Sequence, residues 1–143
     1  MTPGPRTTTE PAPTPTIVAL LGYGGLLPFV LLAVAIFVDG EIAPRGRDAL
    51  FAYGAVILSF VGALHWGFAM SLAALSPRQR TLCFIWSVVP ALLAWPALLV
   101  DTTTASVLLI GGFLSTYWQD RRLAVSVGLP GWYLPLRSRL TVV

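Results

Sequence analysis

The sequence ALFAYGAVILSFVGALHWGFAMSLAAL, residues 49–75, contains no Asp, Glu, Lys or Arg. A helix needs about 20 apolar residues to cross the roughly 30 Å hydrocarbon core of a bilayer, so this run is long enough to span a membrane. It lacks the polar face of a helix from a water-soluble domain and the period of two of a membrane β-barrel strand. The stretch predicts a transmembrane helix, with Asp48 as its N-cap.

Three further apolar runs are long enough to cross a membrane: residues 17–38, 77–100 and 102–119. Pro28 predicts a kink in the first run. A kink is tolerated there because neighbouring helices can form a hydrogen bond to the backbone carbonyl group that the proline leaves without a partner. Ser76 and Pro77 predict the start of a helix, since Ser is a good N-cap and Pro suits the first helical position. Pro90 and Pro96 are expected to bend the second half of that helix.

The two ends of the chain differ from these runs. The first, MTPGPRTTTEPAPTPT (residues 1–16), is rich in Pro and Thr and predicts a disordered cytoplasmic tail. The last, residues 123–143, is apolar but interrupted by Gly and Pro, which predicts an interfacial or re-entrant segment with Trp132 and Tyr133 at the lipid headgroups. The predicted fold is therefore an all-α, polytopic transmembrane helix bundle over residues 17–143, with about four spans plus this C-terminal segment.

The composition agrees with a membrane protein. Of the 143 residues, 56% are hydrophobic and only 10% are charged, whereas a soluble domain has about 25% charged residues. The net charge of +3 does not indicate nucleic-acid binding, because the basic residues lie in short gaps between apolar runs and form no basic patch. The expected surroundings are a lipid bilayer.

The basic residues also predict the orientation. Counted over alternate connections, one face receives seven Arg residues: Arg6, Arg78, Arg80, Arg121, Arg122, Arg137 and Arg139. The other face receives only Arg45 and Arg47, together with Asp39, Glu41, Asp48 and Asp101. Because Arg accumulates on the cytoplasmic side of membrane proteins, both termini are expected in the cytoplasm.

A stripe of small residues runs along the second predicted span, with one member every four residues: Ala55, Ser59, Ala63, Gly67 and Ser71. Small side chains at this spacing let a second helix approach closely. We interpret the stripe as a helix-packing groove, used chiefly against the first or fourth span of the same chain. The alternative is homo-oligomerisation, or contact with another membrane protein, through the same groove.

His65, followed by Trp66, is the one ionisable residue deep in a predicted span, near its middle, and it shares a helix face with Leu58, Val61 and Ala69. Intramembrane ionisable groups suggest function, so this pair is a candidate polar site. A neutral His that forms a hydrogen bond to another helix is the simplest interpretation. Haem or zinc ligation needs further ligands that the spans do not supply. A proton relay needs an acidic partner, and no Asp or Glu is expected at mid-span.

No catalytic pattern is apparent. One His and one Cys (Cys83), without an acidic residue in the spans, do not assemble a nucleophilic triad. No phosphate-binding loop is present, and Gly22, Gly24 and Gly25 do not form a nucleotide fingerprint. No catalytic residue, metal site or cofactor is therefore predicted, and the chain is not expected to be an enzyme.

Four stretches carry a resemblance to a known family: YGAVILSFVGALHWG (residues 53–67), WSVVPALLAW (86–95), DRRL (120–123) and LPGWYLPLRSRLT (129–141). The chain resembles the domain-of-unknown-function 3429 family (transmembrane protein 69-like). The resemblance implies a small polytopic protein of an inner membrane, here the bacterial cytoplasmic membrane, and places His65 and Trp66 within the characteristic stretch. It transfers no catalytic residue. Family members continue past the last stretch into a further apolar span, which is expected to be absent or truncated here.

Two functional hypotheses follow. The first is a non-enzymatic assembly or scaffold factor, or a subunit of a small complex, that acts through helix–helix contacts. The alternative is a minimal transporter or a proton-linked channel subunit that uses His65.

Overall fold

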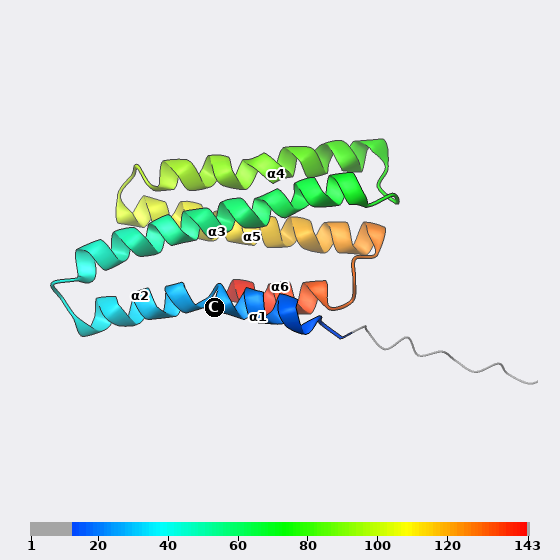
Figure 1. Ribbon diagram of the computed structural model, residues 1–143. Helices are drawn as coiled ribbons and strands as arrows, with labels where there is room; N and C mark the ends of the chain where they lie inside the picture. The colour runs from blue at the N-terminus through cyan, green and yellow to red at the C-terminus, as the bar shows by residue number, and fades with distance from the viewer. Residues whose placement is uncertain (1–12, 143) are drawn as a thin grey trace, which may run out of the picture.

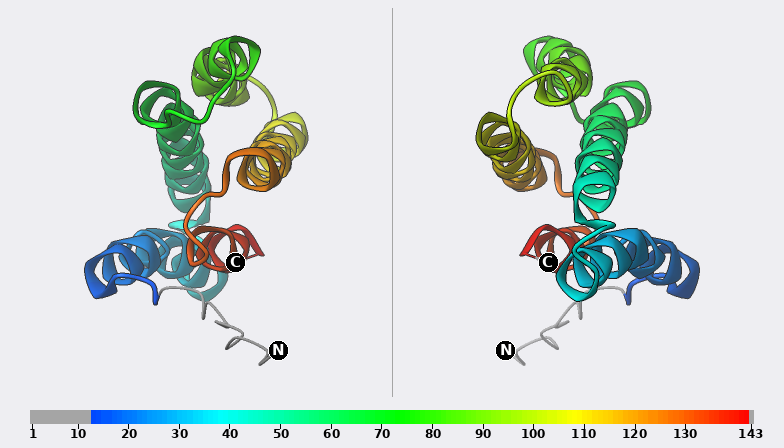
Figure 2. Two further views of the ribbon diagram at one scale, coloured as in Figure 1. Left: turned by 90° about the vertical axis from the view of Figure 1, so that its right-hand side faces the viewer. Right: turned by 90° about the vertical axis from the view of Figure 1, so that its left-hand side faces the viewer.

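The computed structural model describes residues 13–142, and all of its regular structure in this range is helical. The order of elements is α1 (Thr16–Gly24), α2 (Leu27–Val38), α3 (Ala43–Ser71), α4 (Pro77–Ala97), α5 (Thr102–Val127) and α6 (Tyr133–Val142). Helices α3, α4 and α5 lie side by side, while α1, α2 and α6 form a second group beneath them (Figures 1 and 2). The predicted all-α helix bundle is confirmed. Most of the predicted tail, residues 1–12, lies outside the described residues.

Three segments of the described chain are long and apolar enough to cross a membrane: Thr16–Val38, Ala43–Ser71 and Pro77–Ala97. Helix α5 has the length of a span, 26 residues, but its second half is rich in polar residues. The fourth span therefore stays a prediction for α5. The connections alternate between the two ends of the bundle, as the proposed topology requires (Figure 1).

Proline shapes the first span as predicted, although the helix breaks before Pro28 itself. Helix α1 ends at Gly24, and α2 begins at Leu27 with Pro28 in its first turn. A proline ring collides with the carbonyl group four residues earlier, which here is that of Gly24, so the first helix ends there. The Tyr53 hydroxyl donates a 2.8 Å hydrogen bond to the Gly25 carbonyl oxygen, which fixes the break against α3.

The start of α3 differs from the prediction. The helix begins at Ala43, so Asp48 lies inside it and is not its N-cap. Pro44 in the first turn is favourable for helix initiation, and the exposed Arg45 and Arg47 side chains do not oppose helix formation. The helix also ends at Ser71, four residues before the predicted end.

The remaining helix starts follow their capping residues. The Ser76 and Gln79 side chains form a reciprocal capping box at the start of α4, which confirms the predicted start, although α4 ends at Ala97 rather than at residue 100. Asp101 caps α5 by accepting hydrogen bonds from the Thr103 and Thr104 amides. The Thr104 hydroxyl also donates to Asp101 and is the main cause of the lowered pKa of this carboxyl group. The cap therefore stabilises the fold near neutral pH and is lost as the pH falls through that pKa.

The C-terminal part differs most from the sequence prediction. Helix α5 does not end at Gln119 but continues to Val127 and stops at Gly128, whose φ of 67° is left-handed. Gly adopts this conformation without steric cost, so it marks the true end of the helix. After a short connection, α6 runs back along the bundle beside α5 and α1 (Figure 1). The placement of this segment in a membrane, interfacial or re-entrant, stays a prediction.

Candidate functional site

His65 is completely buried on the inner face of α3. Leu58, Val61 and Ala69 are buried on the same face, as the helical spacing predicted. However, His65 lies six residues from the end of α3 at Ser71, which corresponds to about 9 Å of helix. It is therefore closer to the α3–α4 connection than to the middle of the span, where the sequence placed it.

Asp120 faces His65 from the neighbouring helix α5. The distance from His65 Nε2 to Asp120 Oδ1 is 3.4 Å, and the Asp120 side chain is only 1% exposed. The prediction that no acidic residue lies within reach of His65 was wrong. Its cause is the length of α5: a helix ending at residue 119 leaves Asp120 in a loop, whereas the longer helix turns it inward.

The inward direction of Asp120 follows a pattern that is present in the sequence. The buried residues of α5 recur every three or four positions: Ala105, Leu109, Gly112, Thr116, Asp120 and Leu123. This is the spacing of one helix face. Continuing this spacing past Gln119 predicts that Asp120 is buried and that Arg121 and Arg122 point outward.

Arg137 on α6 completes the cluster. Its Nε donates a 2.9 Å hydrogen bond to Asp120 Oδ2, and its Nη1 donates to the Thr141 hydroxyl at 3.1 Å. The Arg137 side chain is 8% exposed. It is therefore buried, although it was one of the seven Arg residues assigned to the cytoplasmic face from the sequence. Asp120 and Arg137 form a buried ion pair between α5 and α6, with His65 of α3 on the other side of the carboxylate.

Aromatic side chains surround this cluster. The Phe68 ring contacts both His65 and Tyr133 edge-on, with ring centres 5.8 and 5.6 Å apart. Trp66, which the sequence grouped with His65, points away: it is 51% exposed and contacts Phe84 of α4. We therefore define the buried polar cluster as His65, Asp120, Tyr133, Arg137 and Thr141.

The buried polar cluster contains several polar atoms without a hydrogen-bond partner. Over residues 13–142, every such buried side-chain atom belongs to it: His65 Nδ1 and Nε2, Asp120 Oδ1, Tyr133 Oη and Arg137 Nη2. Each unsatisfied buried polar group costs about 1–3 kcal/mol, and such groups are rare in native proteins. Their concentration at one place indicates a site that receives water, a proton or a ligand.

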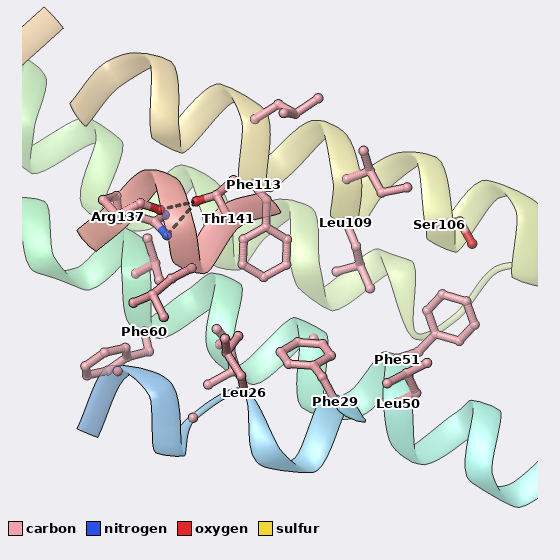
Figure 3. A pocket seen from close by; sticks show the side chains of 18 of the residues that line it. Leu26, Phe29, Leu50, Phe51, Phe60, Ser106, Leu109, Phe113, Arg137 and Thr141 are labelled. Atoms are coloured by element: carbon pink, nitrogen blue, oxygen red, sulfur yellow. Dashed lines mark hydrogen bonds between the residues drawn. The ribbon is translucent and has the colours of Figure 1, made fainter. Parts of the chain in front are cut away.

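A cleft adjoins the cluster on the side of Arg137. It has a volume of about 500 Å³ and lies between the α1–α2 break, α3, α5 and α6. In Figure 3, Arg137 and Thr141 lie at one end of the cleft and Ser106 at the other, while the labelled side chains between them are apolar. The cleft is thus apolar along its length, with polar residues at both ends and its only charged residue, Arg137, at one of them.

The predicted packing groove lies mostly on the outside of the bundle. Ala55 is buried and Ser59 is half-buried, but Ala63, Gly67 and Ser71 are exposed. Apart from its two chain neighbours and the nearby backbone of α3, no atom of residues 13–142 lies within 4 Å of a Cβ added to Gly67. The expected intramolecular use of these last three residues was therefore wrong. Other glycines make the close contacts of α3 with α4 and α5: a Cβ at Gly62 would collide with Pro90 of α4, and one at Gly112 of α5 would collide with Leu58.

Comparison with known proteins identifies the family. The family model described as "Protein of unknown function (DUF3429)" matches residues 14–143. The chain belongs to this family. It is also similar to Transmembrane protein 69 of Xenopus tropicalis, with 42% identity over 135 residues that cover 92% of this chain and 51% of that protein. The DUF3429 chain thus spans about half the length of this relative. No solved structure matches this chain.

Proposed function

We propose that this DUF3429 protein is a proton-linked transport protein or channel subunit in which His65 and Asp120 carry the proton. It is a membrane protein by its apolar helices and by its similarity to a transmembrane protein. The observation that carries the proposal is the concentration of unpartnered polar atoms around His65 and Asp120. Burying charges inside a membrane bundle is costly, and such charges mark proton or ion pathways in membrane proteins.

The geometry suits proton exchange more than rigid packing. His is the side chain whose ordinary pKa lies closest to physiological pH, and its Nε2 lies 3.4 Å from an oxygen of a carboxylate. Arg137 holds one oxygen of the Asp120 carboxyl group through Nε, and the other oxygen faces His65. A water molecule or a small movement of α3 against α5 would complete the proton path between them.

Proton flux across a vesicle membrane tests this proposal. We expect His65→Gln to lower the potential-driven proton flux of reconstituted protein at least tenfold, because Gln keeps the polarity and approximate size of the side chain but cannot carry a proton. The measurement is acidification of liposomes that contain a pH-sensitive dye, with a potassium diffusion potential as the driving force. Trp66→Phe, at the adjacent exposed position, serves as the matched control and should retain the flux. Wild-type vesicles no more permeable than empty ones, or an unchanged His65→Gln flux, would refute the proposal.

A second candidate function is an assembly or scaffold role through the outer face of α3. It is favoured by the open space over Gly67, which is flanked by the exposed Trp66 and Met70. In a bilayer, helices associate through small residues that allow close approach. The partner would be a second copy of the chain or a helix of another membrane protein, and neither candidate function requires catalysis by the chain.

Gly67→Ile tests the scaffold role. We expect this change to weaken self-association or partner binding at least tenfold, about 1.4 kcal/mol, because the branched side chain would hold a second helix away. The measurement is the oligomeric state and the co-purifying proteins in mild detergent. Gly111→Ile is the matched control, since Gly111 on α5 is also exposed with open space around it. Equal assembly of both variants and the wild type would exclude the α3 face as the interface.

We also infer that the protein is a multi-pass protein of the bacterial cytoplasmic membrane with its N-terminus in the cytoplasm. The end of the bundle with the α3–α4 connection carries Arg78 and Arg80, and the α2–α3 end carries Asp39 and Glu41 beside Arg45 and Arg47 (Figure 1). Reporter fusions at Glu41 and after Arg80 should report the periplasm and the cytoplasm, respectively. The opposite result would reverse the orientation.

A further inference from the structure

We propose that the apolar cleft binds a single-chain fatty acid, with its carboxylate against Arg137. The feature that points to a ligand is Arg137 Nη2, which is buried and has no hydrogen-bond partner among residues 13–142. Arg137 lines the cleft, and the other two nitrogens of its guanidinium group are already used by Asp120 and Thr141. The two N–H groups of Nη2 therefore remain as donors for an oxygen atom of a ligand.

The shape of the cleft indicates a chain-like molecule. Its wall on α3 extends from Leu50 to Val61, a rise of about 16 Å at 1.5 Å per residue. The lining between its two polar ends is made of aliphatic and aromatic side chains, such as Phe29, Leu109 and Phe113 (Figure 3). A volume of about 500 Å³ is within the range of small-molecule sites and suits one acyl chain.

The rim of the cleft is accessible from the side of the bundle. Leu21, Phe60, Ile110 and Leu114 line it and are each more than half exposed. These are apolar side chains on the outer surface of a membrane protein, so they face lipid. A fatty acid dissolved in the bilayer could therefore enter laterally between the α1–α2 segment and α5 without crossing water.

The depth of Arg137 argues for a fatty acid rather than a phospholipid. The Arg137 guanidinium group bonds to Asp120, which lies seven residues before the end of α5 at Val127, about 10 Å inside that end of the helix. A phospholipid headgroup stays at the membrane interface, whereas the carboxylate of a single chain is small enough to follow the cleft inward. Guanidinium groups also match carboxylates in geometry and charge.

Charge balance in the buried polar cluster is compatible with a bound carboxylate. The charged or titratable groups at this point are His65 of α3, Asp120 of α5, and Tyr133 and Arg137 of α6. Asp120 and Arg137 neutralise each other, so an added carboxylate is balanced when His65 takes up a proton. Uptake of one proton with one fatty acid would keep the cluster neutral, and only this step depends on the function proposed above.

Binding of hexadecanoate to the purified protein tests the inference. We expect saturable one-to-one binding by native mass spectrometry in mild detergent. Leu114→Trp at the cleft rim should weaken binding at least tenfold by filling the cleft. Arg137→Lys, which keeps the positive charge beside Asp120 but lacks the guanidinium fork, should do the same. Val88→Trp is the matched control: Val88 is half exposed on α4, which contributes no residue to the cleft, so binding should stay within twofold of the wild type.

Two further ligands separate the alternatives. Methyl hexadecanoate has the same chain without the charge and should bind at least tenfold more weakly than hexadecanoate. Phosphatidylglycerol should not displace hexadecanoate. Absence of saturable binding, wild-type affinity of the Leu114→Trp variant, or equal binding of the phospholipid would overturn the inference. Because this measurement involves no pH gradient or membrane potential, its outcome is independent of whether the protein conducts protons.

Discussion

Asp120→Asn is expected to lower the free energy of unfolding by about 3–5 kcal/mol, which is the usual cost of removing one partner of a buried ion pair. Asn cannot neutralise Arg137, whose side chain is 8% exposed and would remain charged in an apolar surrounding. Because Asp120 joins α5 to α6 through Arg137 and faces α3 through His65, the loss should loosen all three helices. Chemical or thermal unfolding of the purified protein in detergent measures the effect.

Two variants serve as controls for this prediction. Asp101→Asn makes the same chemical change at an exposed N-cap, where Asn is as good a cap as Asp, so it should leave the stability almost unchanged. The double variant Asp120→Asn/Arg137→Gln removes both charges and should recover most of the lost stability. If Asp120→Asn is as stable as Asp101→Asn, the ion pair does not hold α6 in place.

The same cluster shows how far the sequence alone predicts the site. His65 could be identified because an ionisable residue interrupts a long apolar run, a local signal. Asp120 and Arg137 could not be paired in this way, because each lies in a polar stretch typical of a membrane boundary. Their burial depends on α5 continuing for two more turns and on α6 turning back, and both are set by Gly128 and by packing between helices distant in sequence.

The fold was more predictable than the site. Continuous apolar runs predicted the helices, and Ser76, Pro77 and Pro28 marked two boundaries through local backbone chemistry. The direction of the small residues was not predictable in the same way. The four-residue spacing from Ala55 to Ser71 suggested a groove used within the chain, yet the contacts with α4 and α5 use Gly62 and Leu58. A spacing defines a helix face but does not say which neighbour covers it.

Gly62→Leu is expected to destabilise the protein by about 3 kcal/mol or more, and Gly62→Ala by about 1–2 kcal/mol. A Cβ at Gly62 would lie 2.7 Å from Pro90 Cγ and 2.9 Å from Pro90 Cβ. The proline ring is rigid and fully buried, so it cannot rotate away, and overpacking of this kind costs about 1–3 kcal/mol even for small additions. A larger side chain would force α3 and α4 apart. Unfolding in detergent measures both variants.

Comparison with another glycine of the same helix isolates this collision. Gly67→Ala meets open space, and Ala is about 1 kcal/mol better than Gly inside a helix, so this variant should be as stable as the wild type or more so. Combining Gly62→Ala with Pro90→Ala removes the ring and should restore stability, with a favourable coupling between the two changes in a double-mutant cycle. If Gly62→Ala is as stable as Gly67→Ala, Pro90 does not pack as closely against Gly62 as the structure shows. The contacts that position His65 would then come from α5 and α6 and not from α4.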